Sequence, residues 1–307
     1  MFTTVLFVIL TITPNPSLDL LFETSRLVWD DANRMDAPRR RPGGQGVNVT
    51  RAARMLGGSS VALVLLGGRV GDELERALAG EGTPYERIDI EGETRVFVGA
   101  REAETGRSML LNPRGPQISP AETEGVVQSI TAVVRRLQPR WVAACGSIPP
   151  GLTSDLYARI GQAAHELGAR FVPDCDGDAL RTAARYADLL VPNRHEAERL
   201  LGLPIVDTMS AARAVRRLHE LGAAVAAITL GAHGAVLSDR LTTWHVEPFS
   251  INRGSAVGAG DAFLAALLIE LEAGSPSEIA LRRAVAAGAA VLHSTGSDLL
   301  RNDMVQH

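Results

Sequence analysis

The residues best suited to chemistry stand late in the chain, in the run Gly258-Ala259-Gly260-Asp261. Apolar residues follow at the spacing of a helix with one buried face, so these glycines stand where a helix begins. The unpaired N–H groups of a helix start attract anions, and glycine lets a ligand come close. A carboxylate is useful there if Asp261 takes a proton while the backbone amides of Gly258, Ala259 and Gly260 hold a phosphoryl group. The alternative is that Asp261 caps the helix and the glycines only turn the chain.

A second glycine-rich run, Gly43-Gly44-Gln45-Gly46, also precedes a segment with the apolar spacing of a helix. It is not a dinucleotide-binding fingerprint, because no strand runs directly into it and its spacing differs. The run suits close contact with an anion or a sugar; a plain loop is the weaker alternative. Asn48, one turn into the helix, either pairs with a sugar hydroxyl or is an ordinary amide on the helix surface.

Two further motifs suit a nucleotide. Asn193 and Glu196 have the spacing of a capping box, which explains both residues. They also suit a second role, in which a carboxylate and an amide arrange water around Mg²⁺ on nucleotide phosphates. Thr229, Gly231 and Gly234 close an apolar run, and their glycines allow a flat base or a phosphate to approach; a hairpin turn is the alternative.

All 31 basic residues are arginine, since the chain contains no lysine. A Walker-A loop and a catalytic lysine are therefore excluded, and phosphate contacts must come from arginine, backbone amides or hydroxyls. Arg34 and Arg95 are the best candidates, because both lie in segments expected to overhang the strand ends and arginine binds phosphate with two hydrogen bonds. The run at 39–41 is interpreted as a solvated charged face.

Several classes of function are disfavoured. A net charge of −4 argues against a general nucleic-acid partner. The apolar run 5–12 is too short to cross a membrane and predicts a buried strand, so we expect a cytoplasmic protein without a membrane partner. Two cysteines are too few for a disulfide framework. Asp174, Asp176 and Asp178 are interpreted as a polar loop and helix start rather than a metal cluster.

Buried apolar runs and amphipathic segments alternate along most of the chain, which predicts a doubly wound, mostly parallel α/β sheet. The predicted strands are 4–12, 61–66, 141–145, 170–173, 188–191 and 224–230. The predicted helices are 72–78, 121–137, 153–167, 178–185, 194–201 and 209–221, besides those that follow the two glycine runs.

The residues that follow these strands are expected to meet at one edge of the sheet, where ligands bind in such folds. They are Asp19, Ser147, Asp174, Asn193 and Gly231. In the segments at about 14–42 and 85–112, apolar and polar residues alternate and do not form continuous apolar runs. This pattern predicts antiparallel strands of a small β lid. The whole chain, 1–307, is thus expected to be one α/β domain carrying this lid.

These motifs together resemble the PfkB-type (ribokinase-like) carbohydrate kinases, and the resemblance covers nearly all of the chain. The two family motifs correspond to the run from Gly43 to Asn48 and to the run from Ala256 to Phe263. The opening Thr13-Pro14-Asn15-Pro16-Ser17-Leu18-Asp19 and the segment from Gly146 to Gly151 are similar to the phosphosugar branch, which includes 1-phosphofructokinase and tagatose-6-phosphate kinase.

The resemblance implies that Asp261 is the catalytic base and that the amides of Gly258, Ala259 and Gly260 form an anion hole. It implies a sugar site formed by Asp19, Gly43, Gly44 and Asn48, and a sugar-phosphate site formed by Arg95 and Ser147. It also implies a nucleotide loop with Thr229, Gly231 and Gly234, and a water-mediated Mg²⁺ site at Asn193 and Glu196. It also implies ATP as the phosphoryl donor and a homodimer formed through the lid.

One departure concerns Gln45, where many family members carry lysine; Arg34 is expected to compensate for this missing cation. The expected activity is an ATP-dependent phosphosugar kinase, first on fructose 1-phosphate at O6, next on tagatose 6-phosphate or fructose 6-phosphate at O1. A silent sugar- or nucleotide-binding protein is the rival hypothesis, because a fold does not fix a function.

Overall fold

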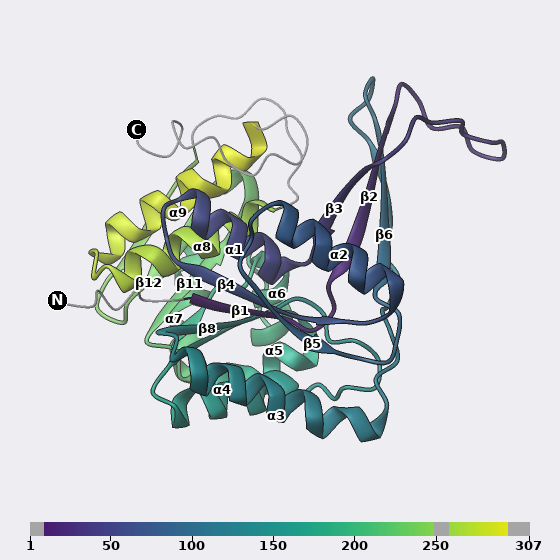
Figure 1. Ribbon diagram of the computed structural model, residues 1–307. Helices are drawn as coiled ribbons and strands as arrows, with labels where there is room; N and C mark the ends of the chain where they lie inside the picture. The colour runs from purple at the N-terminus through teal and green to yellow at the C-terminus, as the bar shows by residue number, and fades with distance from the viewer. Residues whose placement is uncertain (1–8, 249–257, 294–307) are drawn as a thin grey trace.

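The central sheet positions everything else in this computed structural model, which describes residues 9–248 and 258–293. Its strands run parallel in the order β5-β4-β1-β8-β9 (Figure 1). They are β1 (Ile9–Thr13), β4 (Ser60–Leu66), β5 (Tyr85–Asp89), β8 (Trp141–Cys145) and β9 (Arg170–Asp174). The first residues of the predicted strand 4–12, and Ala256 and Val257 of the C-terminal motif, lie outside the described residues.

A second sheet continues the first beyond β9. It has the order β10-β11-β12-β13, in which β10 and β11 are parallel and the other pairs antiparallel. The bounds are β10 (Leu189–Leu190), β11 (Val225–Thr229), β12 (Ala235–Ser238) and β13 (Thr243–Val246). The N–H of Asp188, just before β10, donates to the carbonyl of Phe171 in β9 at 2.9 Å. The mostly parallel α/β fold is thereby confirmed.

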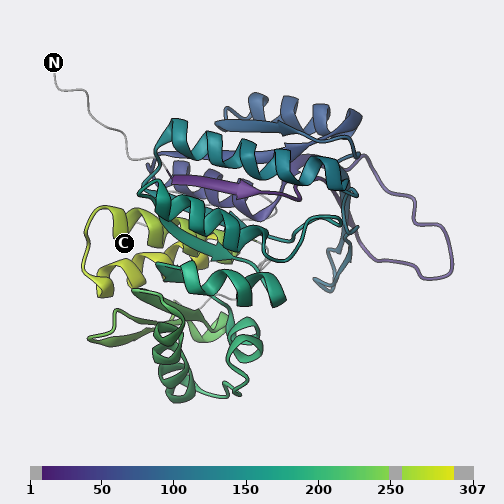
Figure 2. The same ribbon diagram turned by 90° about the horizontal axis from the view of Figure 1, so that it is seen from below.

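Helices cover both faces of the sheet, as Figures 1 and 2 show. One face carries α3 (Pro120–Leu137), α4 (Leu156–Glu166), α5 (Gly177–Ala183) and α7 (Thr208–Leu218). The other carries α1 (Gln45–Met55), α2 (Gly68–Gly80), α8 (Ala259–Glu272) and α9 (Ser277–His293). The helix α6 (Arg194–Leu201) follows β10. In the described part of the chain, every helix is too short or too polar to cross a membrane.

Alternation along the strands explains why both faces are apolar. In β1, Ile9 packs toward α8 and α9, whereas Leu10 and Ile12 pack toward α3 and α4. A strand buried on both sides must be apolar at every position, which is why the sequence shows continuous runs. Burying one such leucine or isoleucine contributes about 1.5–3 kcal/mol, so these runs anchor the strand ends that carry the site.

A third, small sheet stands away from the body of the molecule (Figure 1). Its order is β3-β2-β6-β7, with β2 (Ser17–Thr24), β3 (Arg39–Gly43), β6 (Arg95–Glu102) and β7 (Ser108–Leu111). The expectation of antiparallel pairing throughout is wrong, because β2 and β6 pair in parallel. The expected start of the second lid segment at 85 is also wrong. Residues 85–89 form β5, which pairs with β4 in the central sheet, and the second segment of the small sheet begins with β6 at Arg95.

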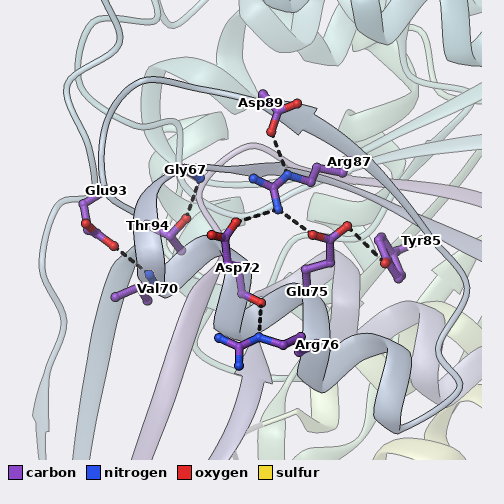
Figure 3. A network of polar contacts seen from close by, with 10 residues as sticks. All are labelled: Gly67, Val70, Asp72, Glu75, Arg76, Tyr85, Arg87, Asp89, Glu93 and Thr94. Atoms are coloured by element: carbon purple, nitrogen blue, oxygen red, sulfur yellow. Dashed lines mark hydrogen bonds and ion pairs between the residues drawn. The ribbon is translucent and has the colours of Figure 1, made fainter.

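The misassigned strand β5 alternates because it is the edge of the central sheet and is fastened by polar contacts to α2. Figure 3 shows Arg87 of β5 at the centre of this network. Its Nη1 donates to Asp72 at 3.0 Å and to Glu75 at 2.5 Å, and its Nε donates to Asp89 at 2.7 Å. A half-solvated edge strand carries charges that a central strand excludes, so its sequence resembles that of a lid strand.

Candidate active site

Asp261 lies in the first turn of α8, three residues after the N-cap Gly258, whose φ of 89° places it in the left-handed region that glycine tolerates. The carboxyl group is buried and accepts a hydrogen bond from Asn48 Nδ2 at 2.8 Å. Burial raises the pKa of Asp261 to about 7, against the opposing effects of Asn48 and of the Arg41 charge. A carboxylate that titrates near neutral pH is suited to general base catalysis.

The start of α8 lies next to this carboxylate. Gly260 is exposed, and a Cβ built on it meets no heavy atom of the described residues within 4 Å. Gly258 and Ala259 are half-exposed. The amide groups in the first turn of a helix lack partners within the helix. The positions predicted to form the anion hole therefore adjoin Asp261 at a helix end.

The second glycine run brings the sugar-site candidates together. Gly44 is the N-cap of α1 with φ 125°, and Asn48 lies one turn later, buried against Asp261. A Cβ on Gly43 would lie only 2.1 Å from Asp19 Oδ1, so glycine is required for the carboxylate to sit there. Asn48, interpreted above as either a ligand residue or a surface amide, is not on the surface.

Asp19 lies within β2, six residues after β1 ends, rather than directly at the end of a strand of the central sheet. It is buried and accepts a hydrogen bond from Ser17 Oγ at 2.6 Å. Burial raises the pKa of Asp19, while the Ser17 hydrogen bond and the charge of Arg41 oppose that rise. Because β2 belongs to the small sheet, Asp19 brings that sheet next to the N-terminal end of α1.

Arg41 is a site residue that the sequence interpretation missed. It was expected on a solvated face, yet its side chain is 17% exposed and its Nε lies 3.7 Å from Asp19 Oδ2. Its neighbour Arg40 points outward and donates to Glu73 at 2.7 Å. Successive residues of a strand face opposite ways, so the arginine run in β3 places one guanidinium inside and the next outside.

Arg95 and Ser147 meet through Asn15, a second residue that the interpretation passed over. Asn15 is buried, and its Nδ2 donates to Ser147 Oγ at 3.0 Å and to the carbonyl of Arg114 at 2.9 Å. Arg95 donates to the carbonyls of Asn15 at 2.8 Å and Pro113 at 3.0 Å. These acceptors are neutral; burial lowers the pKa of Arg95, and the charge of Asp19 opposes that change.

Arg34 is not brought to this cluster. It is exposed on the segment between β2 and β3, which extends away from the body of the molecule in Figure 2. The expectation that Arg34 compensates for the lysine missing at Gln45 is not supported by this position.

The two motifs predicted to bind nucleotide also have the structural roles given above as alternatives: one forms a capping box and the other turns the chain between two strands. Asn193 and Glu196 form a capping box at the start of α6, with Glu196 N–H donating to Asn193 Oδ1 at 3.0 Å. Asn193 also forms a parallel bridge with Thr229, which brings the two motifs side by side. Gly231 and Gly234 turn the chain between β11 and β12, and a Cβ on Gly234 would lie 1.9 Å from the carbonyl of Val246.

Three carboxyl groups near the strand ends influence one another. Burial, with the charges of Asp261 and Glu196, raises the pKa of Asp174 to about 8. Burial also raises the pKa of Glu196. The described residues contain no group of three or more His, Cys, Asp or Glu side chains that could hold a metal ion directly.

Comparison with known proteins places the chain in a family. Residues 15–303 match the family described as pfkB family carbohydrate kinase. The ATP-dependent 6-phosphofructokinase isozyme 2 of Mycobacterium tuberculosis is 30% identical over 299 residues, 97% of this chain and 88% of the relative. The 1-phosphofructokinase of Bacillus subtilis is 29% identical over 287 residues, 93% of each chain.

Solved structures are also similar to this chain over nearly its whole length. The structure of phosphofructokinase-2 from Escherichia coli in complex with potassium superposes with a TM-score of 0.90 at 28% identity, covering 98% of this chain and 97% of that one. Its complex with substrates and products gives a TM-score of 0.88 at 29% identity over 97% of each chain. The chain therefore belongs to the pfkB family of carbohydrate kinases and is a phosphotransferase enzyme.

Proposed function

We propose that the protein is an ATP-dependent phosphosugar kinase whose catalytic base is Asp261. The observation that carries the proposal is the buried Asp261 carboxyl, hydrogen-bonded to Asn48 at 2.8 Å beside a helix start. Asp19 and the Arg95–Asn15–Ser147 cluster supply polar groups for a phosphorylated sugar nearby. ATP is the donor because the Mycobacterium tuberculosis relative is named as ATP-dependent.

In the proposed reaction, Asp19 and Asn48 orient the sugar, and Asp261 accepts the proton of the attacking hydroxyl. The hydroxyl oxygen forms a bond to the γ-phosphorus of ATP as the bond to the bridging oxygen breaks, and ADP leaves. The first-turn amides at Gly258, Ala259 and Gly260 hydrogen-bond the transferring phosphoryl group, and such preorganised donors stabilise its charge. Mg²⁺, held by ATP phosphates and by water at Asn193 and Glu196, would neutralise phosphate charge when bound.

Fructose 1-phosphate, phosphorylated at O6, is the proposed acceptor. The opening from Thr13 to Asp19 supports this choice, since it places Asn15 against Ser147 and against Arg95. Fructose 6-phosphate and tagatose 6-phosphate, phosphorylated at O1, are the alternatives, favoured by the similarity to the 6-phosphofructokinase relative.

Replacing Arg95 with alanine tests the phosphosugar assignment. The KM for the phosphorylated sugar should rise about 10- to 100-fold with kcat changed far less, because a charge-assisted contact contributes about 1.5–3 kcal/mol. Steady-state kinetics with the sugar phosphate measures this. Arg101 lies on the same strand and offers a matched control, for which we expect an unchanged KM. An unchanged KM in Arg95→Ala would remove Arg95 from the phosphate site.

We further propose that the small sheet pairs two subunits. Strand β7 carries the exposed apolar side chains of Leu110 and Leu111, and the segment between β2 and β3 carries those of Val28 and Trp29 (63% exposed). Exposed apolar side chains that gather on one surface are typical of protein interfaces. Trp29→Asp should convert a dimer to a monomer in sedimentation velocity, whereas Leu241→Asp, at an exposed site in the turn between β12 and β13, should leave the mass unchanged. A monomeric wild type would contradict the pairing.

A further inference from the structure

Arg51 is a charged residue of α1 to which the proposed reaction gives no role. Its side chain is only 11% exposed. Nη1 donates to Asn48 Oδ1 at 3.3 Å and to the carbonyl of Pro42 at 2.7 Å. Nε and Nη2 donate to Glu81 Oε2 at 2.8 and 2.6 Å. Glu81 stands at the end of α2, so the guanidinium is held between two helices and the glycine run.

These contacts determine which way the Asn48 amide faces. A guanidinium has only donors, so the atom of Asn48 that meets Arg51 must be the acceptor, Oδ1. The NH₂ group then points to the other side, where it lies 2.8 Å from Asp261 Oδ2. An ionised carboxylate has only acceptors, so this is the orientation it requires.

The opposite orientation is unfavourable at both ends. Turning the amide over would place its oxygen against Asp261 and its NH₂ against the guanidinium of Arg51. The first contact becomes acceptable only when Asp261 carries a proton and can donate it. A protonated Asp261 cannot accept the proton of a sugar hydroxyl. Without Arg51, nothing in this chain of contacts penalises the turned amide at the Oδ1 end.

We propose that Arg51, held in place by Glu81, is a positioning residue that fixes the Asn48 amide as a hydrogen-bond donor to Asp261. The inference rests on the proposed function only for the meaning of Asp261 as a base; the orientation itself follows from the contacts. Arg51 has no hydrogen bond to Asp261, and its contact with the proposed sugar site is the hydrogen bond to Asn48, through which it acts.

Other titratable groups also interact electrostatically with Asp261: Arg41 from β3, Asp174 from the end of β9, and Cys145 from the end of β8. The charge of Arg51 also acts on Asp19. A variant that keeps the charge therefore separates orientation from long-range electrostatics, and Arg51→Lys keeps both the charge and a donor for Asn48.

The experiment is a carboxyl ¹³C NMR titration of the whole protein, with the Asp261 signal assigned by its loss in Asp261→Asn. We expect a midpoint near 7 in the wild type and a rise of about one pH unit in Arg51→Met, the size of effect that one hydrogen bond to a carboxylate supports. Arg51→Lys should restore most of the wild-type midpoint. Arg54→Met is the matched control, because Arg54 binds the carbonyl of Gly82 from the same helix but does not reach Asn48.

A double variant makes the test specific. In an Asn48→Ala background, Arg51→Met should shift the midpoint no further, because the residue through which it acts is gone. An unchanged midpoint in folded Arg51→Met, an equal rise in Arg54→Met, or a full additional shift without Asn48 would each overturn the inference. Should Arg51→Met not fold, Glu81→Gln is titrated instead, with a smaller rise expected and no rise counting against the proposal.

The titration needs neither sugar nor nucleotide. A protein that phosphorylates no sugar would refute the proposed function while leaving the orientation of Asn48 measurable. If the enzyme is active, Arg51→Met should lose kcat at pH 7 and recover it toward pH 9 with KM little changed. A uniform loss at all pH values would show a merely structural role.

Discussion

Asp261→Asn is expected to abolish turnover while the protein keeps its fold and still binds nucleotide. A positioned base contributes about 10²–10⁴-fold to a reaction of this kind, and kcat should fall by at least that factor because asparagine cannot accept the proton. Coupled detection of ADP release measures kcat, and calorimetry measures nucleotide binding. Turnover close to the wild-type rate would remove Asp261 from the role of base.

The same variant also tests whether burying the Asp261 carboxyl lowers the stability of the folded protein. The Asp261 carboxyl has a pKa of about 7 in the folded protein and an ordinary value of 3.8, so between these values only the unfolded chain has released the proton. The contribution of Asp261 to the free energy of unfolding therefore falls as pH rises from about 4 to 7 and stays constant above that range. Asp261→Asn lacks this penalty and should be more stable than the wild type at pH 8, by about 2–4 kcal/mol.

That combination of lost activity and gained stability distinguishes a catalytic carboxylate from a structural one. Urea unfolding at pH 4 and pH 8 measures the difference. Over the same range, kcat of the wild type should rise with pH through about 7 as the base ionises. A variant less stable than the wild type at both pH values would show that the carboxylate supports the fold.

Gly43→Ala is expected to have the next largest effect, and it acts on sugar binding alone. The added methyl group would lie 2.1 Å from Asp19 Oδ1 and 2.4 Å from its Cγ, so the carboxylate must turn away. Because the clash falls on the end of a side chain, the fold can survive. We expect kcat/KM for the sugar phosphate to fall about 100-fold or more, since a small misplacement of a positioning group has that cost.

Gly125→Ala is the control for this substitution. Gly125 lies in α3, and a Cβ there meets nothing within 4 Å, so alanine should leave the kinetics unchanged and slightly stabilise the helix. Fluorescence titration with nucleotide should give the same affinity for both variants and the wild type. If Gly43→Ala retains wild-type kcat/KM, Asp19 does not hold the sugar.

Much of the fold was predictable because burial leaves a clear pattern. The strand 141–145 and the helix 194–201 have the predicted bounds, since an apolar run or a capping box marks each of them. The edge strand β5 was misassigned for the complementary reason. Its exposure allows Arg87 and other charges, which makes its sequence resemble a strand of the small sheet.

Site residues were predictable where they belong to one short sequence motif. Contacts that form only when distant segments pair were not predictable from the sequence. Asn48 and Asp261 stand 213 residues apart, and their sequence positions alone do not show the hydrogen bond that joins them. Arg41 was read as part of a charged run because its burial depends on where β3 pairs with β2. The alternation of a strand was the available signal, and the pairing decides which arginine faces inward.

The most direct test of the central claim is ADP release from ATP and Mg²⁺ in the presence of a panel of acceptors. The panel holds fructose, fructose 1-phosphate, fructose 6-phosphate and tagatose 6-phosphate, each with the wild type and with Asp261→Asn. We predict release with a phosphorylated sugar, fructose 1-phosphate giving the highest kcat/KM, and no release by Asp261→Asn. No release by the wild type with any acceptor would contradict the account and favour a silent sugar- or nucleotide-binding protein.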